Sequence, residues 1–200
     1  MMFLSNCTAN ELINRVQNEL GYANAPDRDF FYTSLNDSLA RIYAELISEK
    51  RRFAAEAAGV TVDLSAITPQ EGCAPTRGAD VSAVWSGDRQ LRFLPYSMLS
   101  LGGKGYYTVA GDLLILGDGS DGADLSVEAV LRPARFTEEN GDGCIPFPDE
   151  FLSLLACRMH GEALRLSGED GEAAKWLGEY NTLLEEFSGW LAALYGRRKG

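Results

Sequence analysis

The 200-residue sequence is poor in the residues that most often carry catalysis or hold metals. It contains one histidine, His160, and four cysteines, which are Cys7, Cys73, Cys144 and Cys157. The cysteine spacings are long and none forms a C-x-x-C pair, so we expect neither a zinc site nor a disulfide framework. We interpret the thiols as free and partly buried.

Long apolar runs are also missing. No stretch approaches the roughly 18 residues that a membrane span requires, so we expect no membrane helix. Residues 1–10 have no basic region and no long apolar core, which argues against a signal peptide. A hydrophobic fraction of 46% and a charged fraction of 24% are typical of a globular protein. The length predicts one domain, or one domain with an insert. Without a signal peptide, the protein is expected to stay in the cytosol where it is made.

Basic residues are scarce relative to acidic ones, and the formal net charge is −11. Residues 112–150 hold ten acidic residues and two arginines. This balance argues against a grip on a phosphate backbone. It fits a surface that does not hold nucleic acid, one that meets a basic partner, or simply a solvated acidic loop. The basic end, Arg197-Arg198-Lys199, is either a solvated tail or an arm that docks on an acidic partner.

Two helices are predicted at the N-terminal end. Thr8 and Glu11 have the spacing of a capping box, an apolar stripe follows at helical spacing, and Gly21 is a natural stop. A second, long helix is predicted to begin after Thr33 or Ser34 and to end at Gly59, because apolar residues keep a helical period from residue 35 to residue 53.

The middle of the chain, residues 60–135, has strand character. The clearest feature is a predicted hairpin over residues 106–116, in which Gly111-Asp112 supplies the turn. We expect these segments to form one small antiparallel sheet. The further predicted elements are strands over 60–64, 80–85, 90–94 and 125–131 and a helical turn over 95–101.

Two helices are predicted to end the chain, one entered from a loop at residues 145–150 and one running from about Asp170 to Tyr195. The last helix has a heptad seam, and the short break at residues 167–169 predicts an antiparallel hairpin. The predicted class is therefore α+β, mainly a helical bundle with an inserted antiparallel β region. The expected domains are a helical core (1–59 and 145–195), the β region (60–135) and a basic tail (196–200).

Motifs that would indicate catalysis or cofactor binding fail on their context. Residues 117–122 match G-x-G-x-x-G, but a strand follows where a phosphate site needs a helix N-terminus. The same segment lacks the ligand register of a calcium loop. Acidic residues are plentiful, yet none lies in a recognisable catalytic motif. We expect no enzyme activity, no metal and no cofactor.

Two groups on the C-terminal helices have a structural and a functional interpretation. Cys157 and His160 share a helix face and could be half of a zinc site or a nucleophile with its base, but we interpret them as a core pair. The last helix is unusually aromatic, which predicts core packing with an excess that contacts a neighbouring subunit. The subunit-interface candidates are Trp176, Tyr180, Phe187 and Trp190.

The order of these segments resembles the phage head-to-tail connector or adaptor family, which includes adaptors of the tail tubular protein A type. The resemblance covers nearly the whole chain. Its segments are Glu11–Val16, Phe31 ahead of Leu35–Leu39, Leu94–Pro95, Tyr107–Leu116, Ile145–Pro146, and the residues Asp170, Ala173 and Tyr180.

The resemblance implies a structural virion protein at the head-tail junction, assembled in the host cytoplasm. It implies a homo-oligomeric ring, typically a dodecamer, that docks under the portal and extends the DNA conduit. The ring would offer a platform to the next tail component, such as a nozzle, tail tube or stopper. Genomic DNA would pass through the lumen without specific binding, and no membrane is involved.

The resemblance also suggests which residues take part. In such adaptors the C-terminal segment often reaches the portal, so the portal-docking candidates are Tyr195, Arg197, Arg198 and Lys199. Acidic side chains in the lumen would let DNA slide without binding. The acidic candidates for the lumen or rim are Asp118, Asp121, Asp124, Glu138, Glu139 and Asp142.

Three alternatives stay open on the sequence. The chain could be another phage ring component, of the head-completion or tail-terminator type. It could be a small helical regulatory protein that binds a host partner. It could also be a hydrolase whose carboxylates are brought together only by the fold.

Overall fold

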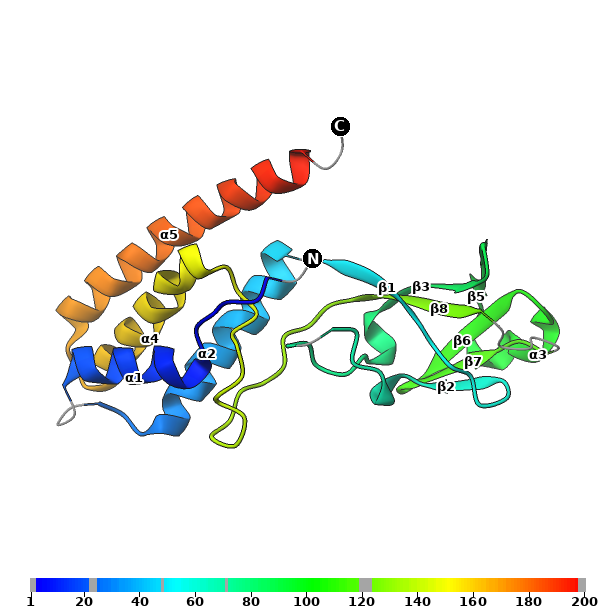
Figure 1. Ribbon diagram of the computed structural model, residues 1–200, viewed down its shortest axis with the longest axis horizontal. Coiled ribbons are helices and arrows are strands. Elements are labelled where there is room, and N and C mark those ends of the chain that lie inside the picture. Colours follow the sequence, from blue (N-terminus) through cyan, green and yellow to red (C-terminus); the bar gives the residue numbers. More distant parts are fainter. Residues whose placement is uncertain (1–2, 22–24, 48, 71, 119–123, 198–200) are drawn as a thin grey trace. The chain divides into compact units, whose positions relative to one another are not determined.

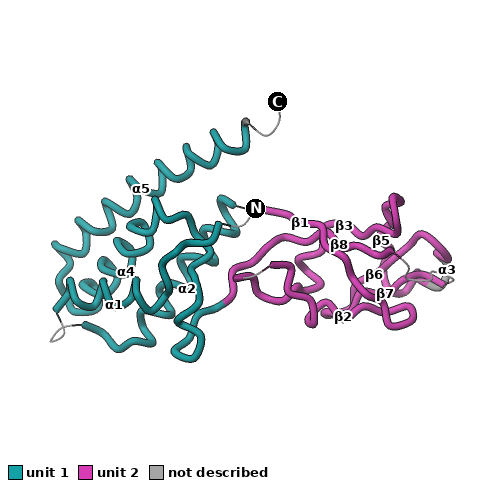
Figure 2. The backbone as a smooth tube through the Cα atoms, in the orientation of Figure 1, with its two compact units in different colours: residues 1–47, 135–200 teal, residues 48–134 magenta. Residues whose placement is uncertain are grey.

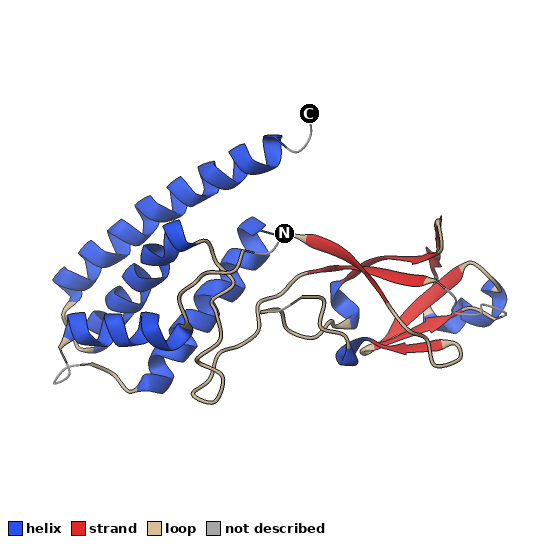
Figure 3. Cartoon of the chain, viewed as in Figure 1, coloured by secondary structure: helices blue, strands red, loops and turns tan. Residues whose placement is uncertain are grey.

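A computed structural model divides the chain into two compact units (Figures 1 and 2). Unit 1 comprises residues 1–47 and 135–200, and unit 2 comprises residues 48–134. Helices dominate unit 1 and strands dominate unit 2 (Figure 3), so the predicted α+β class is confirmed. The residues that the structure describes are 3–21, 25–47, 49–70, 72–118 and 124–197.

Unit 1 is built from helices and connecting loops. Its elements are α1 (Ala9–Leu20), α2 (Arg28–Ile42), the π-helical turn η1 (Tyr43–Ile47), the 3-10 turn η5 (Asp149–Phe151), α4 (Leu152–Leu166) and α5 (Asp170–Arg197).

The capping box at the start of α1 is confirmed. The Glu11 amide donates to Thr8 Oγ1 at 3.1 Å, and the Thr8 amide donates to Glu11 Oε2 at 2.8 Å. These two bonds satisfy backbone donors that the first turn of a helix leaves unpaired. Gly21 follows the helix with φ +78°, a conformation that favours glycine.

The predicted extent of the second helix is wrong at both ends. It begins at Arg28, because the Asp27 carboxylate accepts from the Phe30 amide at 2.9 Å and caps it there. It ends at Ile42 and continues only as η1, whereas residues 50–54 form a strand. Three of these five strand residues are exposed cations, so the spacing of apolar residues does not distinguish a helix from a strand there. Pairing with a strand some 75 residues away decides their conformation.

Helices α4 and α5 pack along each other as an antiparallel pair (Figure 1). The break at Gly168, with φ +80°, lies where the sequence predicts it. The heptad seam of α5 is also confirmed, since Ala173, Tyr180 and Phe187 recur every seven residues and are all buried. Between the two helices, Gly161 lies so close to Leu177 that a Cβ at residue 161 would be 2.6 Å from the leucine Cγ.

Unit 2 contains two four-stranded sheets in the orders β1-β8-β3-β4 and β2-β7-β6-β5. Buried residues of both sheets form one hydrophobic core, centred on side chains such as Val84, Leu114 and Val127. The elements are β1 (Lys50–Ala54), β2 (Thr61–Asp63), η2 (Leu64–Ala66), η3 (Gly78–Asp80), β3 (Val81–Ser86), β4 (Arg89–Gln90), β5 (Arg92–Phe93), η4 (Tyr96–Met98), α3 (Leu99–Gly102), β6 (Tyr106–Ala110), β7 (Leu113–Leu116) and β8 (Leu125–Val130).

The predicted single antiparallel sheet is therefore wrong in two respects. The strands that the structure describes form two sheets, and β5 pairs with β6 in parallel. The predicted strand over residues 90–94 is split at Leu91, whose side chain is buried and whose amide donates to the Val84 carbonyl at 2.8 Å. The segment pairs with β3 before Leu91 and with β6 after it, so it crosses from one sheet to the other.

The hairpin of β6 and β7 is confirmed, with Gly111 at φ +62° in its turn. A second glycine, Gly78, lies against this turn. Its amide donates to Asp112 Oδ1 at 3.1 Å, and a Cβ added to it would overlap the Gly111 carbonyl oxygen and the Val109 side chain. The turn is thus held by a close backbone approach that requires glycine at residue 78.

Candidate functional site

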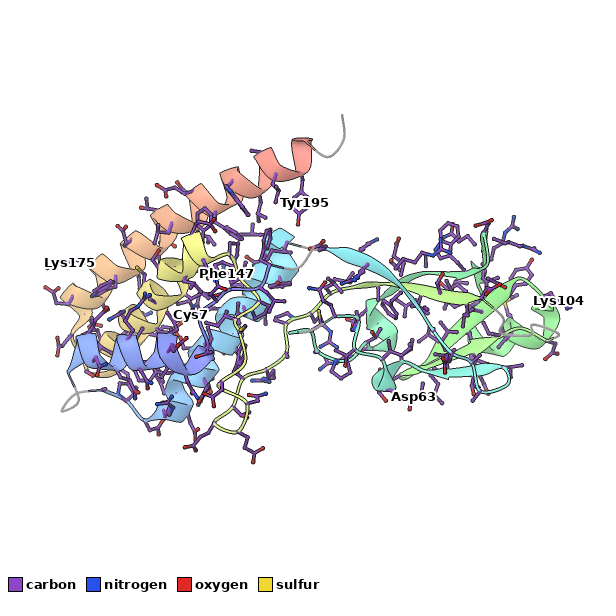
Figure 4. The ribbon with its side chains drawn as sticks, viewed as in Figure 1. Cys7, Asp63, Lys104, Phe147, Lys175 and Tyr195 are labelled. Atoms are coloured by element: carbon purple, nitrogen blue, oxygen red, sulfur yellow. The ribbon has the colours of Figure 1, made fainter. Side chains whose placement is uncertain are left out.

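Phe187, a predicted interface residue, lies in an aromatic cluster inside unit 1. Its side chain is 0% exposed, and its ring centroid is 4.9 Å from that of Phe147 and 5.0 Å from that of Phe151. Figure 4 labels Phe147 among the helices of this unit. Trp190 borders the cluster, 5.4 Å from Phe151, and is partly exposed. Phe187 therefore packs α5 against the loop and the η5 turn that precede α4, within its own chain.

Tyr180 also faces α4. It is 5% exposed, and the guanidinium carbon of Arg158 lies 5.4 Å from its ring centroid. Arg158 Nε is 2.8 Å from Glu162 Oε1 one turn further along α4. The tyrosine ring thus packs against a paired arginine of its own subunit.

Trp176 stacks on His160, with ring centroids 4.3 Å apart and planes 10° from parallel. His160 is 2% exposed, its Nδ1 is 3.0 Å from the Ala156 carbonyl oxygen, and its Nε2 is 3.0 Å from Glu19 Oε2. One nitrogen therefore binds the backbone of α4 while the other faces a carboxylate of α1. The His160 ring therefore lies among three helices of unit 1: its own helix α4, α5 through Trp176, and α1 near Glu19.

Cys157 is buried on the same helix. Burial raises the pKa of its thiol above the usual value, and the nearby carboxylates of Glu179 and Glu19 raise it further. A protonated thiol is a poor nucleophile and a poor metal ligand. Within the described part of the chain, no group of three or more His, Cys, Asp or Glu side chains is arranged to hold a metal ion.

A hollow of about 250 Å³ lies beside His160, where the end of α1 meets the α4–α5 turn. Carboxylates dominate its wall, which also contains Trp176. Such a lining repels phosphate and other anions. The charged and aromatic lining residues are Glu19, His160, Glu169, Glu172 and Trp176.

The C-terminal candidates are placed only in part. Tyr195 lies in the last turn of α5, is half-buried, and points toward the rest of unit 1 (Figure 4). Arg197 is the last residue of α5, and its side chain is not described. Arg198 and Lys199 lie outside the described residues.

The six acidic candidates are divided between the two units. Asp118 and Asp124 are exposed in unit 2, and Asp121 lies outside the described residues. The other three are exposed on a loop of unit 1, where Asp142 Oδ1 accepts from Asn10 Nδ2 at 2.8 Å. The acidic run in the sequence is thus not one continuous surface of one unit. The unit 1 members are Glu138, Glu139 and Asp142.

The structure also presents a surface that the sequence analysis missed, here called the basic–aromatic patch. It belongs to β4, β5, η4 and the approach to β6, next to α3 (Figure 1). Its apolar side chains are the bulkiest exposed group in unit 2. The signal in the sequence was weak, because three cations spread over sixteen residues do not form a run. The patch consists of Arg89, Arg92, Phe93, Tyr96, Met98 and Lys104.

The sequence profile of the family described as SU10 adaptor protein, a phage head-tail adaptor family, matches residues 8–198. The match spans both units and almost the whole chain. The chain belongs to this family. Comparison with curated proteins gave no match.

Membership identifies the chain as a phage adaptor protein of the virion head-tail junction, which assembles with portal and tail components. The family is structural and is not known to be enzymatic. Among the residues that the structure describes, no helix of the adaptor combines the length and apolar character needed to cross a membrane.

Proposed function

We propose that this adaptor forms a ring, typically of twelve copies, beneath the portal. The ring extends the DNA conduit and provides the platform on which the next tail component docks. The observation that carries this proposal is the family match over residues 8–198. A closed ring requires head-to-tail contacts, so that one surface of each copy binds a different surface of the next copy.

Helix α5 is the proposed link to the portal. It is the longest helix of the described chain and ends in the basic run that begins at Arg197. With Tyr195 in its last turn, the segment from Tyr195 to Lys199 would dock by its positive charge on an acidic portal surface. The partly exposed rings of Trp176 and Trp190 are proposed to face a neighbouring copy, whereas Tyr180 and Phe187 stabilise α5 from within.

The acidic candidates are proposed to line the lumen or its rim in two groups, one for each unit. Asp118, Asp121 and Asp124 form the group of unit 2. The exposed loop of unit 1 contributes the other group, with Glu138, Glu139 and Asp142. Carboxylates at these positions repel the DNA phosphates and keep the passing genome from binding.

The test is electron microscopy of the adaptor mixed with its portal. We expect an added ring beneath the portal, with one adaptor copy for each portal copy. Deletion of residues 196–200 is expected to reduce docking, and the matched control is replacement of the same five residues by Gly-Ser-Lys-Lys-Gly, which keeps two positive charges. If the wild type leaves the portal bare, the ring proposal fails. If the deletion docks as well as the wild type, the assignment of the tail to portal docking fails.

A further inference from the structure

The basic–aromatic patch is distinguished by cations that have no carboxylate partner among the residues that the structure describes. Arg89, Arg92 and Lys104 are exposed, and no described carboxylate lies within ion-pairing distance of them. Other cations of unit 2 are engaged: Arg132 Nε is 2.7 Å from Asp80 Oδ2, and Arg52 lies 4.5 Å from the Trp85 ring centroid. The three cations of the patch are therefore available to an outside partner.

All three basic residues lie near Gly105, although only the Arg89 side chain contacts it. The Arg92 amide donates to the Gly105 carbonyl at 2.9 Å, and the Arg89 guanidinium covers the same glycine, where an added Cβ would be 2.8 Å from Nη2. Lys104 precedes the glycine in the chain and lies at the end of unit 2 near α3 (Figure 4). Positive charge is thus concentrated at one edge of the β2-β7-β6-β5 sheet.

The apolar members of the patch are large and open. Phe93 is 57%, Tyr96 67% and Met98 47% exposed. The Phe93 ring is anchored edge-on to Tyr107, with centroids 5.7 Å apart, so it is held in place while most of it faces outward. Aromatic residues, methionine and arginine are the side chains most enriched in protein–protein interfaces. The composition therefore favours a protein partner.

We propose that this patch binds the outward face of α5 in a second copy of the chain. This inference rests on the proposed ring and names one of its contacts. Two identical patches cannot face each other, because their cations would repel. A contact between the patch and a different surface of the second copy avoids this repulsion, and contacts between unlike surfaces are what a head-to-tail ring requires.

Charge complementarity points to unit 1 of the second copy. Its residues include 18 acidic and 10 basic side chains, a net of −8. On α5, Glu179, Glu185 and Glu186 are exposed and have no cation within ion-pairing distance among the described residues. Gly178 and Gly189 flank these glutamates along α5, and a Cβ added to either glycine would meet no atom within 4 Å. Bulky rings can approach the helix backbone there, flanked by carboxylates that pair with the arginines.

The first experiment reverses the charge of the patch. In the portal mixture, R89E/R92E is expected to lower ring occupancy and to weaken self-association at least about tenfold, since attraction becomes repulsion at every contact. The matched control is R77E/R165E, which makes the same change in charge at two exposed arginines outside the patch. Normal rings with R89E/R92E would overturn the inference while leaving the ring itself intact. Absence of wild-type rings would instead overturn the proposed function.

The second experiment identifies the partner surface. E185R/E186R alone is expected to fail as R89E/R92E does, and the combined variant is expected to recover rings. Gly189→Trp, which has room in the isolated chain, should block the contact without loss of helicity. If the combined variant stays defective, the pairing with α5 is wrong. Salt-sensitive binding of duplex DNA by the wild type, lost in R89E/R92E variants that still form rings, would assign the patch to DNA and overturn the proposal.

Discussion

Replacement of Phe187 by alanine separates two roles for this residue. As a subunit-interface residue, Phe187 would matter to assembly and little to the isolated chain. In the structure its ring is 0% exposed and lies between Phe147 and Phe151, with centroid distances of 4.9 and 5.0 Å. We therefore expect Phe187→Ala to destabilise the isolated adaptor.

The magnitude follows from the burial and the ring contacts. Replacing a fully buried phenylalanine by alanine costs about 3–5 kcal/mol through lost transfer energy and the cavity left behind. Each aromatic pair adds about 0.5–1.5 kcal/mol beyond area burial. The cluster is closed on one side by Trp190, 5.9 Å from Phe187 and itself partly exposed, so some relaxation is possible. We expect a loss of about 4 kcal/mol, or a decrease in Tm of about 8–16 °C for a chain of this size.

The assay is urea unfolding of the isolated adaptor, followed by far-UV circular dichroism, which reports mainly on the helices of unit 1. Glu186→Ala is the matched control, because Glu186 is the preceding residue of the same helix and is exposed. The control should change the free energy of unfolding by no more than about 0.5 kcal/mol. A loss below about 1.5 kcal/mol for Phe187→Ala, with ring formation abolished, would refute the core role and restore the interface role.

Three further predictions concern packing, hydrogen bonding and thiol chemistry. Gly78→Ala should lower the free energy of unfolding by about 1–3 kcal/mol in thermal denaturation, because the added alanine Cβ would overlap the turn between β6 and β7. An unchanged Tm would contradict the close approach of residue 78 to this turn. Asn36→Ala should lower the free energy of unfolding by about 2–4 kcal/mol in urea, because the buried side-chain amide of Asn36 hydrogen-bonds both the N–H and the C=O of Phe136 at 2.8 Å. Asn36→Asp should keep at most one of these two bonds. Equal stability of the wild type and both variants would show that the two bonds do not stabilise the fold. Burial raises the pKa of Cys73 to about 11, so the exposed Cys144 should react with Ellman's reagent before Cys73 does. Because the Cys73 thiol ionises at lower pH in the unfolded chain than in the folded one, the free energy of unfolding should fall between about pH 9 and 11. This part of the fall should be absent in Cys73→Ala.

Local signals in the sequence predicted the elements that depend on near neighbours. The Thr8–Glu11 cap, the Gly111 turn and the heptad seam of α5 each involve residues within one or two turns of one another. Their physics is contained in a short window, and the structure has them where the pattern predicts. The adaptor family was recognisable for a related reason, since the order of such elements survives in the sequence.

The predicted strands over 60–64, 80–85 and 125–131 are confirmed as β2, β3 and β8, but other features that depend on distant partners were predicted wrongly or missed. In the sequence, residues 50–54 look like a continuation of the preceding helix, but in the structure they form a strand that pairs with β8. The chain crosses from one sheet to the other at Leu91, whose side chain is buried in the core that the two sheets share. The basic–aromatic patch was missed because its residues come from several segments, and tertiary pairings such as that of β5 with β6 bring these segments together.

Whether a feature of this chain can be predicted from the sequence depends on how far apart in the sequence its interacting residues lie. The sequence by itself determined the cap of α1, the Gly111 turn, the class of the protein and the acidic balance, since each depends on local backbone chemistry or on composition. The tertiary structure alone decided which aromatic residues of α5 face inward, how the acidic candidates divide between two units, and where the unpaired cations gather. Burial and proximity are properties of packed surfaces, and one residue more or less in a strand or helix is enough to change the face on which a side chain lies.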